Sequence, residues 1–253
     1  MSLQQDKIIS SSHLPMDFDL RSGAMILIDK PKGWTSFDVV NKVRHAIRHH
    51  LKIKKFKVGH SGTLDPMATG LLLLCIGKYT KLLHDLTSVN KSYSGSIKLG
   101  ATTPSYDAES DEDQCFPTDH ITDEMLTIAA QSFVGGYAQI PPIFSAIKLD
   151  GQALYKLARR GETIELKPRD VMIHSFDLHP MENNNVDFIC ACGKGTYIRS
   201  LAFDLGKGVD SGGYLTVLRR ETVEEYNVSD ALTVDEAVNW VRSVDLEAQI
   251  IPQ

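Results

Sequence analysis

The chain has 253 residues, of which 42% are hydrophobic and 23% are charged, and its formal net charge is −5. These values are typical of a soluble globular protein that is long enough to bury a substantial core. No apolar run approaches the roughly 18 residues that span a bilayer, and the polar start does not resemble a signal peptide, so we expect neither a membrane protein nor a secreted one.

The first expected elements are a tail, a strand and a helix. Residues 1–22 are largely polar, so we expect a mobile tail there and one domain over residues 23–253. Residues 25–29 predict a short apolar strand. Thr35 or Ser36 then offers an N-cap for a helix. Apolar side chains recur behind this cap at helical spacing, namely Phe37, Val39, Val40, Val43 and Ile47.

Residues 52–58 alternate in part between basic and apolar side chains, which predicts a strand with a wet, basic face. Such a face could be a solvated edge that lysines protect from pairing, or it could contact a phosphate backbone. Residues 1–100 carry 15 Lys and Arg against 7 Asp and Glu, whereas residues 101–253 carry 12 against 25. The negative net charge therefore hides a basic first part, and a local basic surface is what binds phosphates.

Residues 59–70, Gly-His-Ser-Gly-Thr-Leu-Asp-Pro-Met-Ala-Thr-Gly, hold one carboxylate, Asp65, in a loop rich in small residues. Glycines allow positive φ angles and close backbone approach, and Pro66 restricts the chain just after the carboxylate. The apolar run 71–76 predicts a buried element that anchors the loop. An ordinary Gly/Asp turn is the simpler interpretation, but the loop could equally present a single acid rigidly to a large anionic partner.

The remainder of the chain mixes strands and helices. Asp107–Asp113 is an acidic run, for which a solvated loop is a better interpretation than a magnesium site. Thr122 predicts the cap of a helix that stops at Gly135–Gly136, and Thr233 with Glu236 predicts a capping box for a last helix through Val241. Further expected elements are strands at 93–99 and 186–192 and helices at 154–160 and 197–205.

This order lacks a clean βαβ alternation, which predicts an α/β (α+β) fold with a mixed sheet and helices packed against it. The four cysteines are too few and too irregular for a disulfide framework, and they lack zinc-ligand spacing. Alternation along strand 186–192 places Cys190 and Cys192 on one face. We therefore expect reduced, packed thiols and a cytoplasmic location.

The twelve-residue loop closely resembles the catalytic-aspartate motif of the TruB family of tRNA pseudouridine synthases. Other segments resemble motifs of the same family in the same order, and together they cover roughly residues 25–225. They are residues 25–36, Lys91–Tyr93 with Ile97–Gly100, Gln139–Lys148 with Gly151–Gln152, Gly195–Leu201 and Leu218–Arg220.

The resemblance implies the pseudouridine synthase fold, with a largely antiparallel central sheet, flanking helices and RNA-binding loops. It implies isomerisation of the uridine at position 55, in the T-loop of tRNA, after the base has left its stack. This chemistry needs no metal, redox cofactor or nucleotide triphosphate, and the sequence carries no motif for one. We expect tRNA, bound through its T-arm, as the partner of a monomer.

The residues that match the family's motifs give the expected roles in the site. Asp65 is the essential catalytic carboxylate, which could engage the sugar or the base. Arg199 is expected to pair with Asp65 and keep it charged, because a buried carboxylate must be paired or become protonated. Tyr93 is expected to stack on the extracted uracil. Outside the motif context, Tyr93 would be read as a core residue and Arg199 as a surface arginine on a helix.

Five further residues are expected to bind the substrate. Tyr197 and Leu218 would line the pocket of the base, and His60 would fill the space that the flipped base leaves in the RNA. Lys30 and Pro31 would shape the floor beneath the site. Two of these residues also have a simpler interpretation: Leu218 could be a core residue, and His60 could be an exposed or structural group.

The chain departs from the family at its end and after the tyrosine motif. Only about thirty residues follow Leu218–Arg220, too few for the C-terminal PUA domain of many members, so we expect a short form or a truncated one. Ser105 stands where the family often has threonine. Two other functions stay open, a non-catalytic tRNA-binding or folding chaperone and a nucleoside hydrolase. The hydrolase would need a second carboxylate, for which only Asp29 and Asp204 lie in or beside the motifs.

Overall fold

The computed structural model describes residues 4–145, 148–149, 152–154, 160 and 166–245. The chain divides into two compact units, residues 1–91 with 219–253 (unit 1) and residues 92–218 (unit 2). The sequence predicts one domain over residues 23–253, whereas in the structure the packing is concentrated within each of two units. In the described part of the chain, none of the helices has the length and apolarity needed to cross a membrane.

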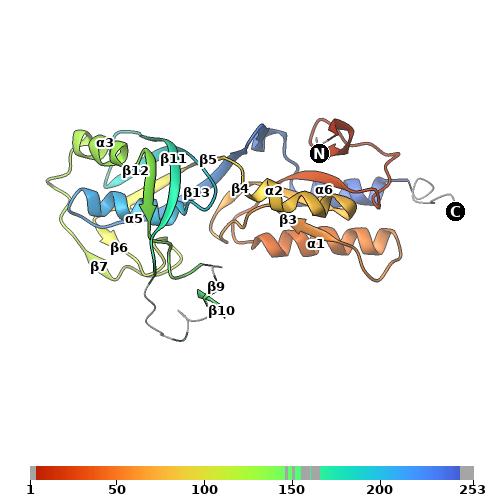
Figure 1. Ribbon diagram of the computed structural model, residues 1–253, viewed down its shortest axis with the longest axis horizontal. Coiled ribbons are helices and arrows are strands. Elements are labelled where there is room, and N and C mark those ends of the chain that lie inside the picture. The colour runs from red at the N-terminus through yellow and green to blue at the C-terminus, as the bar shows by residue number, and fades with distance from the viewer. Residues whose placement is uncertain (1–3, 146–147, 150–151, 155–159, 161–165, 246–253) are drawn as a thin grey trace. The chain divides into compact units, whose positions relative to one another are not determined.

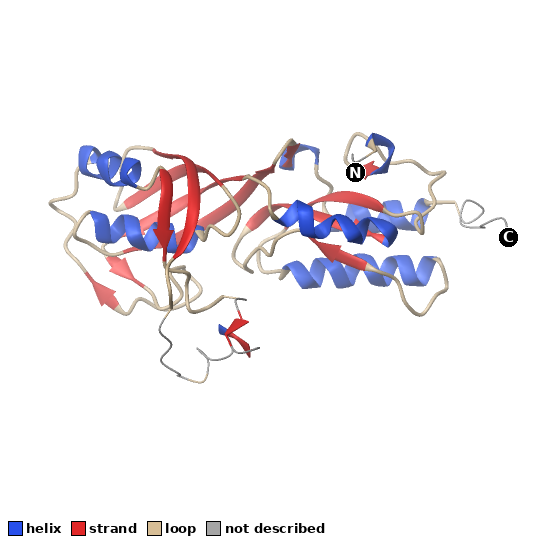
Figure 2. Ribbon diagram, in the orientation of Figure 1, coloured by secondary structure: helices blue, strands red, loops and turns tan. Residues whose placement is uncertain are grey.

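Unit 1 is built on strands with helices against them (Figures 1 and 2). The strands are β1 (Ile8–Ile9), β2 (Ala24–Lys30), β3 (Val58–His60), β4 (Thr69–Ile76), the end of β13 (Gly213–Val223) and β14 (Tyr226–Asn227). The helices are α1 (Ser36–His50), α2 (Leu83–Thr87) and α6 (Val234–Ser243), with 3-10 turns at Gln5–Lys7, Gly77–Leu82 and Val228–Asp230. β2 and β3 pair antiparallel with β4, whereas β1 pairs parallel with β2. β13 pairs parallel with the start of β4.

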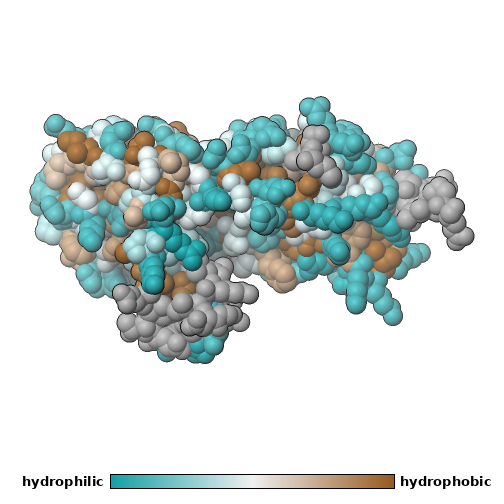
Figure 3. Space-filling view, in the orientation of Figure 1, coloured by the Kyte–Doolittle hydropathy of each residue, from teal (hydrophilic) through white to brown (hydrophobic). Residues whose placement is uncertain are grey.

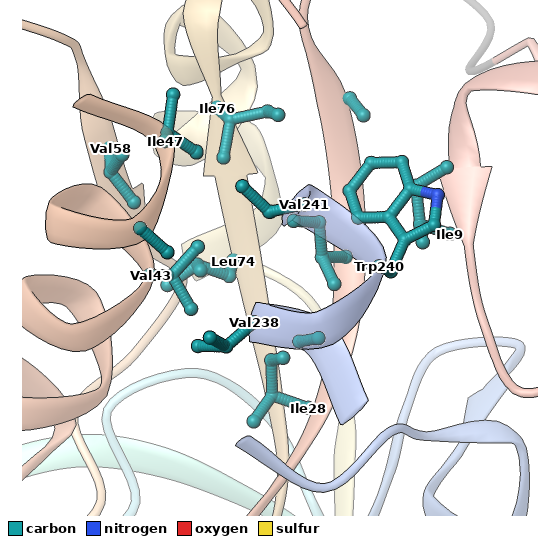
Figure 4. Packing of buried hydrophobic residues seen from close by; sticks show 14 of the residues in the cluster. Ile9, Ile28, Val43, Ile47, Val58, Leu74, Ile76, Val238, Trp240 and Val241 are labelled. Atoms are coloured by element: carbon teal, nitrogen blue, oxygen red, sulfur yellow. The ribbon is translucent and has the colours of Figure 1, made fainter. Parts of the chain in front are cut away.

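The sheet of unit 1 is buried on both faces, which explains the unbroken apolar run of β4. Ile26 and Ile28 of β2 pack with the apolar stripes of α1 and α6 in one cluster (Figure 4). Met25 and Leu27 point to the opposite face and belong to a second cluster, which includes Leu86 of α2. Alternation along β2 thus divides its side chains between the two clusters.

Residues 4–22 do not form the expected mobile tail. Ile8 and Ile9 pair with β2, and Ile9, Phe18 and Leu20 are buried in the cluster of Figure 4. Phe18 also packs edge-on against Trp240 of α6, with ring centroids 5.6 Å apart. These three apolar side chains hold the polar segment against the sheet because each of the three is almost completely buried.

Helix α1 follows its predicted cap, but the segment behind it does not form the predicted strand. Thr35 and Asp38 make a complete capping box, as the sequence allowed. Phe37, expected in the apolar stripe, is 59% exposed. Residues 52–57 are irregular, with Lys52 at a φ of 52°, and β3 begins only at Val58, where pairing with β4 starts.

Unit 2 contains the other described strands in the order β13, β5 (Lys91–Leu99), β12 (Asn185–Cys192), β11 (Arg169–Leu178) and β8 (Gly135–Gln139). Short pairs are β6 (Ala101–Thr102) with β7 (Gln114–Cys115) and β9 (Lys148–Leu149) with β10 (Gln152–Ala153). The helices are α3 (Asp123–Ser132) and α5 (Ile198–Gly208). The strands predicted at 93–99 and 186–192 are confirmed as β5 and β12, and the helices predicted behind Thr122 and at 197–205 are confirmed as α3 and α5. The helix predicted at 154–160 falls mostly outside the described residues.

The predicted fold class is confirmed. Strands pair mostly antiparallel, helices flank them, and parallel pairs in the described sheet, β1 with β2 and β13 with β4, make it mixed. Cys190 and Cys192 are buried on one face of β12 as free thiols, as expected, and Cys75 is buried too, whereas Cys115 is exposed and not packed as predicted.

Candidate active site

Asp65 lies half-buried in the loop between β3 and β4 of unit 1, the aspartate loop (residues 61–68). Gly62 adopts a φ of +82°, which a side chain would make costly. The Asp65 carbonyl accepts a hydrogen bond from the Ala68 amide at 3.1 Å, which closes a turn around Pro66. The local sequence thus bends the chain twice, once before and once after the carboxylate.

Two residues of the predicted N-terminal motif anchor the neighbours of Asp65. The Ser36 hydroxyl accepts from the Leu64 amide at 2.8 Å and lies 3.2 Å from the Leu64 carbonyl, to which it donates. The Gly33 amide donates to the Pro66 carbonyl at 2.8 Å. The residue before Asp65 and the residue after it are therefore both held by the segment that leads into α1.

Lys30 is completely buried beneath this segment. Its ammonium group donates to the carbonyls of Trp34 at 2.6 Å and Pro31 at 3.0 Å, and it approaches the Pro66 carbonyl at 3.5 Å. These bonds join the motif to the aspartate loop, so Lys30 shapes the loop from within. The Pro31 ring is on the surface, where the residue is exposed.

His60 ends β3 and is half-buried, and its Nδ1 atom is buried without a hydrogen-bond partner in the described structure. Burial lowers the pKa of His60, a hydrogen bond with the Gly62 backbone opposes this, and the charge of Arg220 lowers the pKa further. The ring is therefore held in its neutral form at neutral pH. The hydroxyl of the adjacent Ser61 is also buried without a partner.

Four predicted residues lie in unit 2, on adjacent elements. Tyr93 of β5 and Leu218 of β13 are both mostly buried, at 8% and 6% exposure, on neighbouring strands. Arg199 lies in the first turn of α5, and Tyr197 is the N-cap residue of the same helix. Gln139 holds the backbone of Tyr197 with two hydrogen bonds. The Gln139 side-chain oxygen accepts from the Tyr197 backbone amide at 2.8 Å, and the side-chain nitrogen donates to the Tyr197 carbonyl at 3.0 Å.

Arg199 is 4% exposed and forms an ion pair with Asp107, with Nε 3.5 Å from Oδ2. The guanidinium also donates to the carbonyls of Ser105 and Phe144, each at 2.9 Å. The other Asp107 oxygen accepts from the Ser105 hydroxyl and the Glu109 amide. The sequence placed Asp107 in a solvated acidic loop, but it is 1% exposed because it is the buried counter-ion of an arginine.

Sequence reasoning missed Ser36, Gln139, Asp107 and Arg220, although all of them stand inside or just beyond the quoted segments. The expected pairing of Asp65 with Arg199 would join the two units, and it stays a prediction.

Among the described residues, no group of three or more His, Cys, Asp or Glu side chains is placed to hold a metal ion.

The two other acidic residues near the motifs have partners of their own. Arg219 binds Asp29 with two nearly parallel hydrogen bonds of 3.1 and 2.8 Å. Asp204 accepts a hydrogen bond from the Tyr137 hydroxyl, and burial raises the pKa of Asp204.

Known proteins resemble this chain over most of its length. Residues 48–198 match the model of the TruB family pseudouridylate synthase (N terminal domain). The tRNA pseudouridine synthase B of Flavobacterium johnsoniae is 49% identical over 213 residues, which are 84% of this chain and 93% of that protein. The protein of the same name from Phocaeicola vulgatus is 44% identical over 232 residues, which are 92% of this chain and 99% of that protein.

Solved structures share the fold. A chain in the crystal structure of a Cbf5-Nop10-Gar1 complex superposes with a TM-score of 0.65 at 24% identity, covering 98% of this chain and 64% of that chain. A chain in the structure of an H/ACA RNP bound to a substrate RNA containing 2'-deoxyuridine gives 0.62 at 21% identity, covering 96% and 64%. This chain thus spans less than two thirds of both. With the family model and the curated relatives, these findings show that the chain belongs to the TruB family of pseudouridylate synthases.

Proposed function

We propose that this chain is a tRNA pseudouridine synthase that isomerises the uridine at position 55 of tRNA, as a monomer in the cytoplasm. The observation that carries the proposal is the aspartate loop, in which Asp65 lies between two anchored neighbours, Leu64 and Pro66. Catalysis depends on a reactive group held in position, because a bound and oriented carboxylate avoids most of the entropy cost of the encounter. Relatives of the same family are named for this activity.

In the proposed reaction, the bond between the ribose and N1 of uracil breaks, the base turns, and a new bond forms to C5. C5 loses its proton and N1 gains one, so the product is an isomer of the substrate. Asp65 engages the sugar or the base as the essential carboxylate. Arg199 keeps Asp65 ionised, and Tyr93 and Leu218 confine the detached base between an aromatic ring and an apolar wall. Tyr197, fixed by its helix cap, lines the same pocket.

The base must leave the T-loop before Asp65 can reach it. We propose that His60 fills the vacated space. A neutral, half-buried ring suits this role because it can stack among bases without the cost of desolvating a charge, and burial lowers the pKa of His60.

The phosphates of the T-arm require a basic surface. Residues 32–57 carry eight Lys and Arg against one acidic residue, Asp38. The lysines of the segment behind α1 are exposed. Arg44 holds the C-terminal end of this segment by donating to the Val58 carbonyl at 2.9 Å. We propose that this segment contacts the RNA backbone beside the aspartate loop. The exposed lysines are Lys52, Lys54, Lys55 and Lys57.

A hydrolase would need a second free carboxylate near the first. Asp29 is already held by Arg219, in the same unit as Asp65, and therefore suits that role poorly.

The deciding experiment incubates an unmodified T-arm hairpin with the wild-type protein and with Asp65→Asn. Pseudouridine is mapped by chemical adducts and reverse-transcription stops, and hairpin affinity is measured in parallel. We expect modification of the T-loop uridine by the wild type alone, with affinity kept by the variant. Tight binding without product from either protein would favour a folding chaperone. A released uracil base would instead point to a hydrolase.

A further inference from the structure

Arg220 is a buried cation beside the aspartate loop. It is 1% exposed and is among the largest completely buried side chains of the protein. An arginine in a protein does not lose its proton, and removing its charge from water costs several kcal/mol. In the described part of the chain, Arg220 takes part in no ion pair with a carboxylate. A neutral side chain would fill the space at lower cost, so the charge and its donors call for an explanation.

The donors of Arg220 connect the aspartate loop to β4. Its Nε donates to the Leu71 carbonyl at 2.6 Å, and Nη2 donates to the Gly62 carbonyl at 3.3 Å. Leu71 lies in β4, behind the loop, and Gly62 lies at its first bend. One planar guanidinium thus joins the two sides of the loop, a task that suits its fixed fork of donors.

The backbone around Arg220 is shaped for this contact. β13 and β4 pair in parallel with Arg220 opposite Gly70. A Cβ atom on Gly70 would lie 2.3 Å from the Arg220 carbonyl oxygen, which no real packing allows. Gly70 therefore permits the close approach of β13, and this approach carries the guanidinium to the Leu71 carbonyl.

We propose that Arg220 is a positioning residue for catalysis: by holding the Gly62 carbonyl, it fixes the bend from which the chain proceeds to Asp65. Ser36 and Gly33 hold Leu64 and Pro66, and Arg220 adds an anchor at the first bend of the loop, next to the Ser61 amide that donates to the Leu73 carbonyl at 3.0 Å. The proposal rests on the proposed function for the meaning of Asp65. The geometry of the loop, however, can be measured without any enzyme activity.

Arg219 provides a matched control. It precedes Arg220 on β13, has the same chemistry, and points the other way, to Asp29. Its side chain is about one third exposed and does not contact the aspartate loop in any hydrogen bond within the described residues. Loss of Arg219 therefore tests the general cost of removing an arginine from this strand.

The test compares Arg220→Gln, Arg220→Lys and Arg219→Gln with the wild type. Single-turnover rates at saturating T-arm hairpin, hairpin affinity, thermal unfolding and amide hydrogen exchange are measured for each protein. We expect Arg220→Gln to lower the rate about 100-fold, because a displacement on the order of 1 Å at a reacting group can cost that much. Hairpin affinity should stay within about twofold, since a transition-state effect leaves ground-state binding unchanged. The Leu64 amide should exchange faster, while Arg219→Gln keeps the rate and the exchange.

Arg220→Lys keeps the charge but loses the fork, so we expect an intermediate loss of rate, about tenfold, at near-native stability. This variant decides the question if Arg220→Gln does not fold. A folded Arg220→Gln or Arg220→Lys protein with the wild-type rate and wild-type exchange at 61–65 overturns the proposal in favour of packing alone. A loss confined to hairpin affinity also overturns it, in favour of an RNA contact. If the wild type makes no pseudouridine, the proposed function fails, and the exchange of residues 61–65 still decides whether Arg220 holds the loop.

Discussion

Three buried cationic side chains donate hydrogen bonds to backbone carbonyls, most of which lie in irregular segments. Lys30 donates to Trp34 and Pro31, Arg199 donates to Ser105 and Phe144, and Arg220 donates to Leu71 and Gly62. Loops leave carbonyls that no strand or helix satisfies, and a charged donor makes a stronger bond to them than a neutral one. The protein thus uses buried charge to give loops one fixed shape.

Loss of Asp107 should destabilise unit 2. Asp107→Asn removes the carboxylate charge whose Oδ2 lies 3.5 Å from Arg199 Nε and so breaks this buried ion pair on one side. Breaking a buried pair on one side costs about 3 kcal/mol. We expect that loss in the free energy of unfolding, measured with urea. Asp111→Asn, in the exposed part of the same acidic run, is the control and should change stability little.

His60 should make stability depend on pH. Its pKa in the folded protein lies below the ordinary value of 6.5, because burial disfavours the charged ring. The unfolded chain therefore binds a proton more readily, and stability falls as pH drops from 6.5 towards the lowered pKa. We expect His60→Gln to reduce this slope, measured as the free energy of unfolding between neutral and mildly acidic pH. His49→Gln, on the exposed face of α1, should keep the wild-type slope, and equal slopes for both variants would contradict the assignment.

At the scale of elements, the sequence predicted those features whose contacts lie between residues close together in the chain. Thr35 and Thr233 cap α1 and α6 as predicted, because a capping box lies within four residues of sequence. Strand β1 escaped prediction, since two residues hold no periodicity and its pairing with β2 is a tertiary event. The segment behind α1 shows the opposite error: its partial alternation predicted a strand, yet β4 offers pairing only from Val58 onward.

The same distinction between local and long-range contacts explains which residues of the candidate site could be predicted. Asp65, Tyr93 and Arg199 could be named because family motifs mark them. Ser36 and Asp107 could not be given their roles, since their bonds to Leu64 and Arg199 cross 28 and more residues of sequence. No periodic pattern encodes such a bond, so the supporting residues appear only when the fold is known.

The contact between β13 and β4 should be sensitive to the addition of a single methyl group. Gly70→Ala places a Cβ atom 2.3 Å from the Arg220 carbonyl oxygen, and Gly70 has a φ of +103°. Both effects must be relieved by moving backbone, so we expect a loss of about 4 kcal/mol, among the largest for point changes. Gly136→Ala in β8 meets no atom within 4 Å and is the control. Urea unfolding of both variants checks the difference, and equal stabilities would mean that β13 can shift at no cost.

The charge of the whole molecule is unevenly distributed along the chain. The first 100 residues carry 15 Lys and Arg against 7 acidic residues, whereas the last 153 carry 12 against 25. Unit 1 takes most of the basic part, including the aspartate loop and the exposed lysines behind α1. A net charge of −5 therefore does not exclude an anionic substrate, because phosphates respond to the local potential.

Salt dependence of tRNA binding should reveal which lysines contact phosphates. Each lost phosphate contact reduces the slope of log affinity against log salt by roughly 0.7–0.9, because fewer counterions are released. We expect Lys54→Gln with Lys55→Gln to reduce the slope by about 1.5 and to weaken binding at low salt. The single-turnover rate at saturating RNA should stay the same, since neither lysine is placed in the catalytic machinery. Lys207→Gln with Arg242→Gln removes two exposed charges elsewhere and should leave the slope unchanged. Equal slopes for the two double variants would mean that the segment behind α1 is only a solvated face, and that the RNA is held by other cations.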